Sequence, residues 1–167
     1  MNQQSAVLGD LSPEEFLRDY WQKKPLLIRN AIPDFEPPID GDELAGLSLE
    51  TEVESRLVVV TEWQLENGPF TEQRFQTLPS SHWTLLVQAV DLWVPEVAAL
   101  LREFDFLPPW RLADIMVSYA QDGGRVGPHF DYFDVFLLHG AGQRRWQLGQ
   151  ACAASSPLLA TTDLKIL

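Results

Sequence analysis

The residues of this sequence best suited to chemistry lie in the short stretch Gly127-Pro128-His129-Phe130-Asp131. On an extended segment, residues two apart point to the same side, so His129 and Asp131 can offer an imidazole nitrogen and a carboxylate oxygen to one ion. These are two of the three ligands of a facial triad, in which two histidines and one carboxylate leave positions on iron(II) open for a cosubstrate and O2. A single H-x-D motif also occurs on ordinary protein surfaces, so its meaning depends on its surroundings.

The surroundings of this motif are typical of a strand-rich domain. Apolar strands are predicted at residues 115–119, 134–138 and 145–148. Gly- and Pro-rich turns separate them, at residues 122–128 and 140–142. Closely spaced strands with tight turns favour an antiparallel sandwich or a small barrel.

Both helices and extended segments are expected in the first 110 residues. Ser12, Pro13 and Glu15 supply the cap, the first-turn proline and the capping box of a helix that we expect to run to about Gln22. Further helices are expected at 40–49 and 95–104, and strands at 26–28 and 56–60. Residues 82–90 fit either a buried strand or the start of a helix, and Asn67-Gly68 indicates a turn between extended segments.

Length and composition indicate a folded soluble protein of one domain with a short arm. The chain has 167 residues, of which 46% are hydrophobic and 22% charged. It contains neither an apolar run of the roughly 18 residues that span a membrane nor an N-terminal secretory pattern, so we expect a cytoplasmic protein. Cys152 is the single cysteine. An internal disulfide is therefore impossible, and a metal must rely on histidine and carboxylate.

The charge of the chain bears on its partners. Twelve Lys and Arg residues against 24 Asp and Glu residues give a formal net charge of −12. Such a surface repels nucleic acid and attracts a basic protein or peptide. The same acidity would also serve solubility alone, and the sequence leaves both interpretations open.

A family resemblance connects these features. The stretch from Asp114 to Gly149 closely resembles the JmjC-type, cupin-like ribosomal oxygenases, in particular the bacterial ribosomal protein arginine hydroxylases, and residues 16–29 and 83–90 extend the likeness. It implies a mainly β fold with flanking helices, a double-stranded β-helix (jelly-roll) that is incomplete at the C-terminus here. Residues 1–110 would form an N-terminal α+β region that contributes strands to the barrel, and residues 111–167 the first part of the barrel core.

The resemblance also implies an activity. Its members are iron(II) and 2-oxoglutarate dependent dioxygenases that convert 2-oxoglutarate and O2 to succinate and CO2, and the bacterial ones hydroxylate the β-carbon of an arginine in large-subunit ribosomal protein sixteen. His129 and Asp131 match the first two metal ligands and catalytic residues. Arg144 matches the residue that binds the far carboxylate of 2-oxoglutarate, for which a guanidinium fork is well suited. A basic ribosomal protein would be the substrate, and the full-length protein would be a homodimer.

Three residues near these positions have less specific interpretations. Asp134 falls where relatives keep an acid, and either a hydrogen bond behind the metal ligands or plain solvation would account for it. Met116 and Tyr119 could line the cosubstrate pocket, but we favour a place for them in the barrel core.

The sequence departs from the family at one point. The second metal-binding histidine should follow a later Gly- and Pro-rich turn, and neither His82 nor His139 occupies that position. We expect that the chain is the N-terminal piece of a longer oxygenase, because residues 155–167 end on an apolar pattern. A short paralogue without catalysis is the other explanation. The chain alone would then be inactive, and its open strand edges would favour self-association.

Two further functions compete with the oxygenase. A non-catalytic cupin-like module could bind a basic protein without turnover. A sugar-binding or isomerase cupin is disfavoured by the Arg144-Arg145-Trp146 sequence and by the lack of a histidine-rich metal set.

Overall fold

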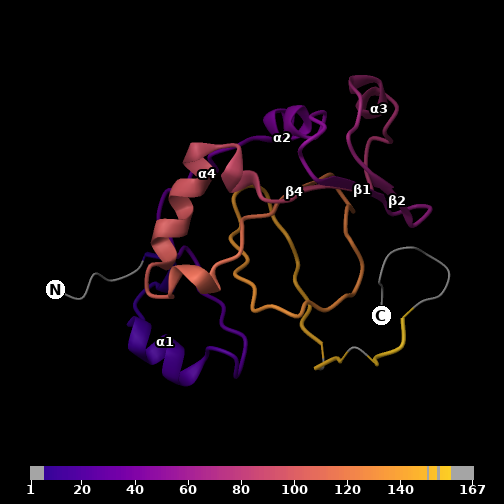
Figure 1. Cartoon of the computed structure of the whole chain (residues 1–167). Helices are drawn as coiled ribbons and strands as arrows, with labels where there is room; N and C mark the ends of the chain where they lie inside the picture. The colour runs from indigo at the N-terminus through magenta and orange to yellow at the C-terminus, as the bar shows by residue number, and fades with distance from the viewer. Residues whose placement is uncertain (1–5, 150, 154, 159–167) are drawn as a thin grey trace.

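The structure, a computed structural model, describes residues 6–149, 151–153 and 155–158 (Figure 1). Its α-helices are α1 (Pro13–Asp19), α2 (Gly41–Leu47), α3 (Glu72–Gln76) and α4 (Pro95–Ala99). The 3-10 helices are η1 (Ala6–Leu8), η2 (Val90–Leu92), η3 (Leu100–Phe104) and η4 (Pro109–Arg111). The strands are β1 (Ser55–Val59), β2 (Gln64–Asn67), β3 (Trp83–Val87) and β4 (Val117–Ala120). None of the helices in this part of the chain is long and apolar enough to cross a membrane.

The strands form one antiparallel sheet in the order β2-β1-β3-β4. The strand predicted at 56–60 is confirmed by β1, whose β-branched and leucine residues suit a buried pleated surface. Residues 82–90, which fit either a buried strand or the start of a helix, contain both. They include the strand β3 and the first residue of the 3-10 helix η2. The expected strand at 115–119 is confirmed by β4, which pairs with β3. The sheet therefore joins segments from both sides of residue 110, and the domain division expected there stays a prediction.

The hydrophobic core lies between the sheet and the helical segments. Leu57 of β1 and Leu85 of β3 stand opposite each other and are almost fully buried. Leu44 of α2, Val90 of η2 and Val97 of α4 belong to the same buried cluster. Because burying each such side chain contributes about 1.5–3 kcal/mol, this cluster is the main source of stability of the described chain.

The predicted helices are confirmed in position and are shorter than expected. In the capping box of α1, Ser12 Oγ accepts the Glu15 N–H at 3.2 Å and Glu15 Oε2 accepts the Ser12 N–H at 3.0 Å. The helix ends at Asp19, because a turn follows in which Gln22 has a left-handed φ of 57°. The helix expected at 95–104 is α-helical to Ala99 and then tightens into η3.

The strands expected at 26–28, 134–138 and 145–148 are wrong, since none of these segments is part of a sheet. A strand needs a neighbour that pairs with its backbone N–H and C=O groups, and within the described residues no strand lies alongside them. Most of the large apolar side chains of these segments are exposed in the described chain. Their composition carries no information on whether a partner strand is present. The apolar end at residues 159–167 lies outside the described residues.

The turn expected at Asn67-Gly68 is also wrong. β1 and β2 are instead joined through residues 60–63, and Asn67 is the last residue of β2, opposite Arg56. The Gly68 N–H donates a hydrogen bond to the Ser55 carbonyl at 2.9 Å, and a Cβ at this position would clash with the Ser55 side chain. Glycine is therefore required here by close approach to a neighbouring strand, which the Asn-Gly pair in the sequence does not distinguish from a hairpin turn.

Candidate functional site

The H-x-D motif lies beyond β4, after a turn that depends on glycine. Gly123 and Gly127 have left-handed φ angles of 73° and 82°, which glycine adopts without the steric cost of a side chain. A Cβ at Gly123 would lie 2.7 Å from the His82 imidazole, so that ring packs directly on the turn. The His82 N–H also donates to the Asp122 carbonyl at 2.7 Å. The predicted Gly-rich turn before the motif is therefore confirmed, and it is anchored to the residue preceding β3.

His129 and Asp131 are brought together with their ligand atoms facing each other. His129 Nε2 lies 3.7 Å from Asp131 Oδ2, and the two side chains are 41% and 53% exposed. His129 Nδ1 lies 3.0 Å from the Gly127 carbonyl oxygen. Because a carbonyl only accepts, this hydrogen bond requires the proton on Nδ1 and leaves the Nε2 lone pair for a cation.

This pair of donors fits part of a metal site. Metal bonds to imidazole nitrogen and carboxylate oxygen measure about 2.0–2.2 Å, so two atoms 3.7 Å apart can contact one ion. A neutral imidazole with a carboxylate is also the donor chemistry of the facial triad. Within the part of the chain that the structure describes, no group of three or more His, Cys, Asp or Glu side chains could hold a metal. The described donor set therefore consists of His129 and Asp131.

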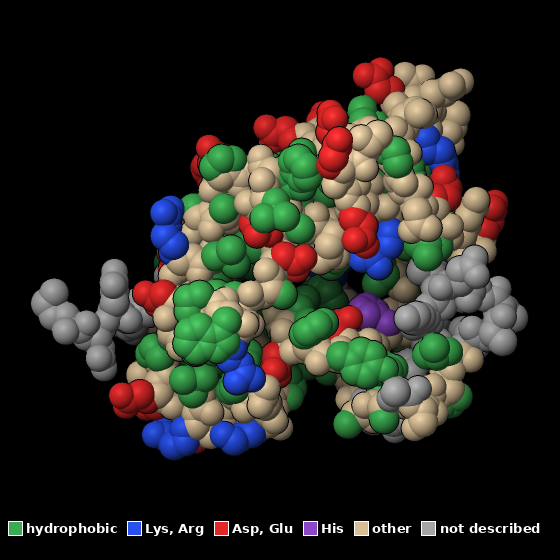
Figure 2. Space-filling view, viewed as in Figure 1, with side chains coloured by type: hydrophobic (Ala, Val, Ile, Leu, Met, Phe, Trp, Pro, Cys, Tyr) green, Lys and Arg blue, Asp and Glu red, His purple; other side chains and the backbone are tan. Residues whose placement is uncertain are grey.

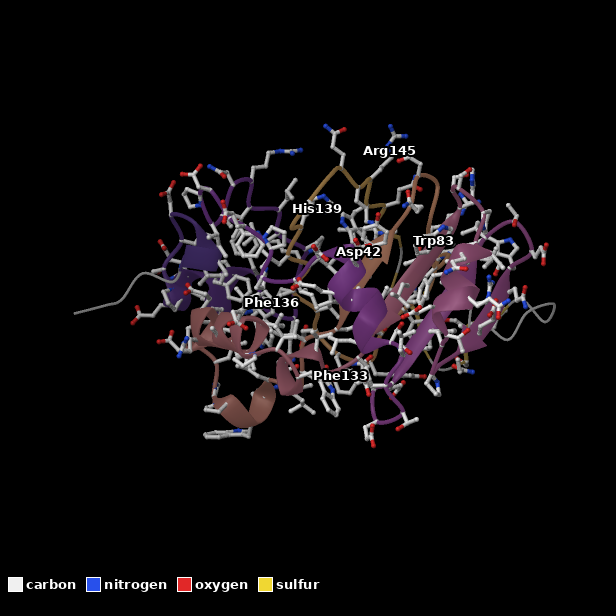
Figure 3. All side chains as sticks on the ribbon, turned by 90° about the horizontal axis from the view of Figure 1, so that it is seen from above. Asp42, Trp83, Phe133, Phe136, His139 and Arg145 are labelled. Carbon is white, nitrogen blue, oxygen red and sulfur yellow. The ribbon has the colours of Figure 1, made fainter. Side chains whose placement is uncertain are left out.

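Arg144 directly precedes the strand expected at 145–148, which the structure does not contain. Its segment is not part of the sheet, and the guanidinium carbon lies 5.6 Å from the centroid of the Trp146 ring, a cation–π contact. Among the described residues no hydrogen bond or ion pair joins Arg144 to His129 or Asp131. In Figure 3, Arg145 lies at the outer edge of the molecule. The cosubstrate role of Arg144 therefore stays a prediction.

The other two histidines have surroundings of their own. His82 Nδ1 lies 2.7 Å from Ser81 Oγ, and its ring packs on the Gly123 turn. His139 precedes Gly140, where a Cβ would lie 3.0 Å from the Pro37 ring, so this part of the chain passes close to the loop before α2. Figure 2 shows one histidine at the margin of a hollow in the centre of the face, among hydrophobic side chains.

The residues favoured for the barrel core are more exposed than expected. Met116 and Tyr119 are 45% and 36% exposed. The Tyr119 ring packs against Trp83 with centroids 5.7 Å apart, and its hydroxyl accepts a hydrogen bond from Gln121 at 3.1 Å. Both therefore stand at the surface of the described sheet.

The segment after the motif is held by the N-terminal part of the chain, which the sequence did not predict. The Phe136 ring stacks on the Trp21 ring, with ring centroids 5.6 Å apart and an angle of 20° between the ring planes. The centroids of the Phe136 and Phe104 rings lie 4.8 Å apart. Asp134 accepts a hydrogen bond from Gln22 Nε2 at 2.9 Å. Figure 3 places Phe136 on the side of α1 and α4. The aromatic residues of these segments were a visible signal, but only the fold shows which rings meet.

Comparison with known proteins finds proteins similar to this chain. Residues 99–167 match the JmjC domain family. The probable ribosomal oxygenase of Haemophilus influenzae is 43% identical over 159 residues, which cover 93% of this chain and 39% of that protein. The ribosomal protein uL16 3-hydroxylase of Escherichia coli is 46% identical over 138 residues, which cover 81% of this chain and 36% of that protein.

Solved structures agree with the sequence matches. The ribosomal oxygenase YcfD from Escherichia coli in complex with cobalt and 2-oxoglutarate superposes with a TM-score of 0.70 at 45% identity, covering 73% of this chain and 34% of that one. The complex of YcfD with cobalt and succinic acid gives a TM-score of 0.69.

The H-x-D motif lies within the residues that match the JmjC domain family, and the described chain is built on an antiparallel sheet with flanking helices. Over most of its length the chain is similar to the N-terminal part of proteins named as ribosomal oxygenases. It spans a little over a third of the length of these curated relatives.

Proposed function

We propose that this chain is the N-terminal part of an iron(II) and 2-oxoglutarate dependent oxygenase that hydroxylates a ribosomal protein. The observation that carries the proposal is the paired donor set, since His129 Nε2 and Asp131 Oδ2 face each other 3.7 Å apart. Its support is the 46% identity to a protein named as a uL16 3-hydroxylase and the likeness to a structure that holds cobalt and 2-oxoglutarate. The β-carbon of an arginine side chain is the proposed point of oxidation.

In this proposal each residue of the chain has a defined task. His129 and Asp131 hold the iron, and the Gly127 carbonyl keeps the imidazole in the tautomer whose Nε2 is free to bind. Arg144 binds the distal carboxylate of 2-oxoglutarate through its guanidinium fork. Iron held by His129 and Asp131 would offer open coordination positions to 2-oxoglutarate and O2. A third ligand is required for turnover, and it would come from residues other than those described.

The partners follow from charge and from the open surface. A formal charge of −12 favours a basic ribosomal protein as substrate. The likeness to a protein named as a ribosomal protein hydroxylase supports a cytoplasmic place of action. Tyr132 and Phe133 are 75% and 78% exposed, and β2 and β4 are the edges of the described sheet. We infer that the 167-residue chain self-associates through these surfaces and that the longer protein is a dimer. Sedimentation of the chain as a concentration-independent monomer would contradict this inference.

Metal titration tests the first step of the proposal. Calorimetry with cobalt(II) should show binding to the chain that His129→Ala abolishes, and that is weaker than binding by a complete relative because a ligand is missing. The matched control is His139→Ala, which we expect to leave binding unchanged. Loss of binding in the control instead would place the metal at His139.

Turnover tests the second step. A polypeptide extended to the length of the relatives should hydroxylate an arginine-containing ribosomal peptide in the presence of iron(II) and 2-oxoglutarate, detected as one added oxygen by mass spectrometry. The 167-residue chain should not. Activity of the short chain would refute the need for further residues, whereas an inactive extended protein that still binds the peptide would favour the non-catalytic binding module.

Substitution of Arg144 tests the cosubstrate assignment in the extended protein. Arg144→Ala would leave the buried carboxylate of 2-oxoglutarate unpaired, at a cost of about 2–5 kcal/mol in cosubstrate affinity. Arg144→Lys should recover part of it, because lysine keeps the charge without the fork. Arg145→Ala is the control. A larger rise of the 2-oxoglutarate Michaelis constant for Arg145→Ala than for Arg144→Ala would move the assignment to Arg145.

A further inference from the structure

The turn after α1 contacts the segment that follows the H-x-D motif through two consecutive side chains. Gln22 Nε2 donates to Asp134 Oδ2 at 2.9 Å, and the neighbouring Trp21 stacks on Phe136 at 5.6 Å between centroids. Asp134 lies three residues after Asp131. These contacts join parts of the chain that are 112 residues apart in sequence.

The backbone of this turn is fixed in an unusual conformation. Gln22 has a φ of 57°, in the left-handed region that residues with a side chain rarely adopt. The Trp21 N–H donates to the Phe16 carbonyl at 3.0 Å, and the Lys23 N–H donates to the Tyr20 carbonyl at 2.9 Å. The turn is therefore tied to α1 before Gln22 and to Tyr20, the residue that follows α1, after it. A conformation of this kind persists where the surrounding structure determines it, and such positions are often functional.

Gln22 also suits Asp134 chemically. A glutamine amide donates a hydrogen bond without adding a charge, so it can fix the orientation of the Asp134 side chain. Asp134 is a second carboxylate close in sequence to the proposed ligand Asp131. Within the described residues it does not join His129 and Asp131 in a group that could hold a metal. The hydrogen bond to Gln22 holds it toward α1.

We propose that Gln22 is a positioning residue for the metal-binding segment, which it acts on through Asp134. The inference rests on the proposed function, because it assumes that His129 and Asp131 bind the metal. Gln22 itself does not contact His129 or Asp131 in any described hydrogen bond. Its contribution is to fix the segment that carries them on the α1 turn, while the stacked Trp21 and Phe136 rings supply the apolar half of the same attachment.

The test is a cobalt(II) titration of the 167-residue chain, followed by calorimetry and by the visible absorption of the bound ion. Gln22→Ala should raise the dissociation constant by about three- to tenfold, less than the ~10–100-fold typical of groups that bond directly to a ligand, because Gln22 acts one contact further out. It should also change the shape of the cobalt spectrum, which reports ligand geometry. The exchange Gln22→Glu with Asp134→Asn keeps the net charge and restores the hydrogen bond with donor and acceptor reversed, so it should recover the wild-type affinity and spectrum.

The matched control is Gln88→Ala. Gln88 Nε2 donates to Asp114 Oδ2 at 2.7 Å, and this is also an exposed glutamine–aspartate hydrogen bond between distant segments, away from the motif. We expect it to leave the cobalt affinity unchanged. Equal weakening by both alanine variants, or no weakening by Gln22→Ala, would overturn the inference, and so would failure of the exchanged pair to recover binding.

The His129→Ala variant separates failure of this inference from failure of the proposed function. If it leaves the titration unchanged, or if the unchanged chain shows no saturable binding, the proposed metal site itself is wrong. If His129→Ala abolishes binding while Gln22→Ala matches the unchanged chain, the metal site stands and the positioning role of Gln22 is wrong.

Discussion

The sheet and the H-x-D segment of this chain differ in strand pairing and in burial. In the sheet, β1 and β3 are paired on both sides, and Leu57 and Leu85 are almost completely buried between them and the helices. The residues from 129 to 138 have no strand partner in the described chain and are mostly exposed. The stable part of the molecule therefore carries no candidate chemistry, and the part with candidate chemistry depends on attachments to other segments.

The two regions also differ in the contacts that hold them in place. In the sheet, the central strands β1 and β3 pair on both sides and bury their apolar side chains against the helices. The H-x-D segment is attached by the Phe136 rings and by the Gln22–Asp134 hydrogen bond, while Tyr132 and Phe133 remain exposed. Substitutions in the two regions should therefore differ in kind, affecting stability in one and metal binding in the other.

The largest loss of stability is expected in the sheet. Leu85→Ala would leave a cavity in the core cluster and should lower the free energy of unfolding by about 2–5 kcal/mol. Urea denaturation followed by circular dichroism measures the change. The exposed Leu92→Ala, just after the sheet, is the matched control and should change stability by less than about 0.5 kcal/mol. A loss below about 1 kcal/mol for Leu85→Ala would mean that the sheet is not the stable region.

A smaller loss is expected where the two regions meet. Phe136→Ala removes the half-buried ring that stacks on Trp21 and contacts Phe104, and should cost about 1–3 kcal/mol. Phe133→Ala, from the same segment, removes an exposed ring and serves as control. Hydrogen exchange should show faster exchange of residues 130–138 in Phe136→Ala alone. Equal effects of the two variants would show that the segment is not attached through Phe136.

A pH-dependent effect of about 1 kcal/mol is expected within the sheet region. Arg74 donates hydrogen bonds to both oxygens of Glu66 at 2.7 and 2.8 Å, and these hold the pKa of the Glu66 carboxyl below its ordinary value despite partial burial. Because the pKa is lower in the folded state, the stabilisation is full above the unfolded pKa of about 4.3 and is lost as pH falls through the folded pKa. Glu66→Gln should therefore cost about 1 kcal/mol at pH 7 and progressively less below about pH 4.

Thermal unfolding of Glu66→Gln and of the unchanged chain from pH 2 to pH 8 measures the difference in their stability. Glu62→Gln, an exposed carboxylate in the turn before β2, is the control and should follow the unchanged chain at every pH. A stability gap for Glu66→Gln that stays constant down to pH 2 would contradict the assignment of the ion pair.

The smallest effect on stability is expected at the motif itself. His129→Ala removes an exposed side chain whose described contacts are to Gly127 and Asp131, so the free energy of unfolding should change by less than about 0.5 kcal/mol. The same variant should abolish cobalt binding. A loss of stability above about 1 kcal/mol would show that His129 is a structural residue of the turn and would weaken the contrast between the two regions.

The sequence by itself determined the local features of this protein. The capping box at Ser12 and Glu15 depends on neighbours within a few residues, and it is present in the structure. The β-branched run at 56–60 and the glycines before His129 also indicated a strand and a turn that the structure contains. The H-x-D motif and the resemblance to JmjC-type ribosomal oxygenases were equally readable, because both are patterns along the chain.

Only the tertiary structure decided which distant segments meet. Apolar residues at 134–138 and 145–148 predicted strands, but a strand exists only beside a partner, and the local sequence does not say whether one is present. The hydrogen bond of Gln22 with Asp134 joins residues that are 112 positions apart, and the sequence around neither residue predicts it. Closing such a contact depends on the folding of everything between, so no local pattern can encode it.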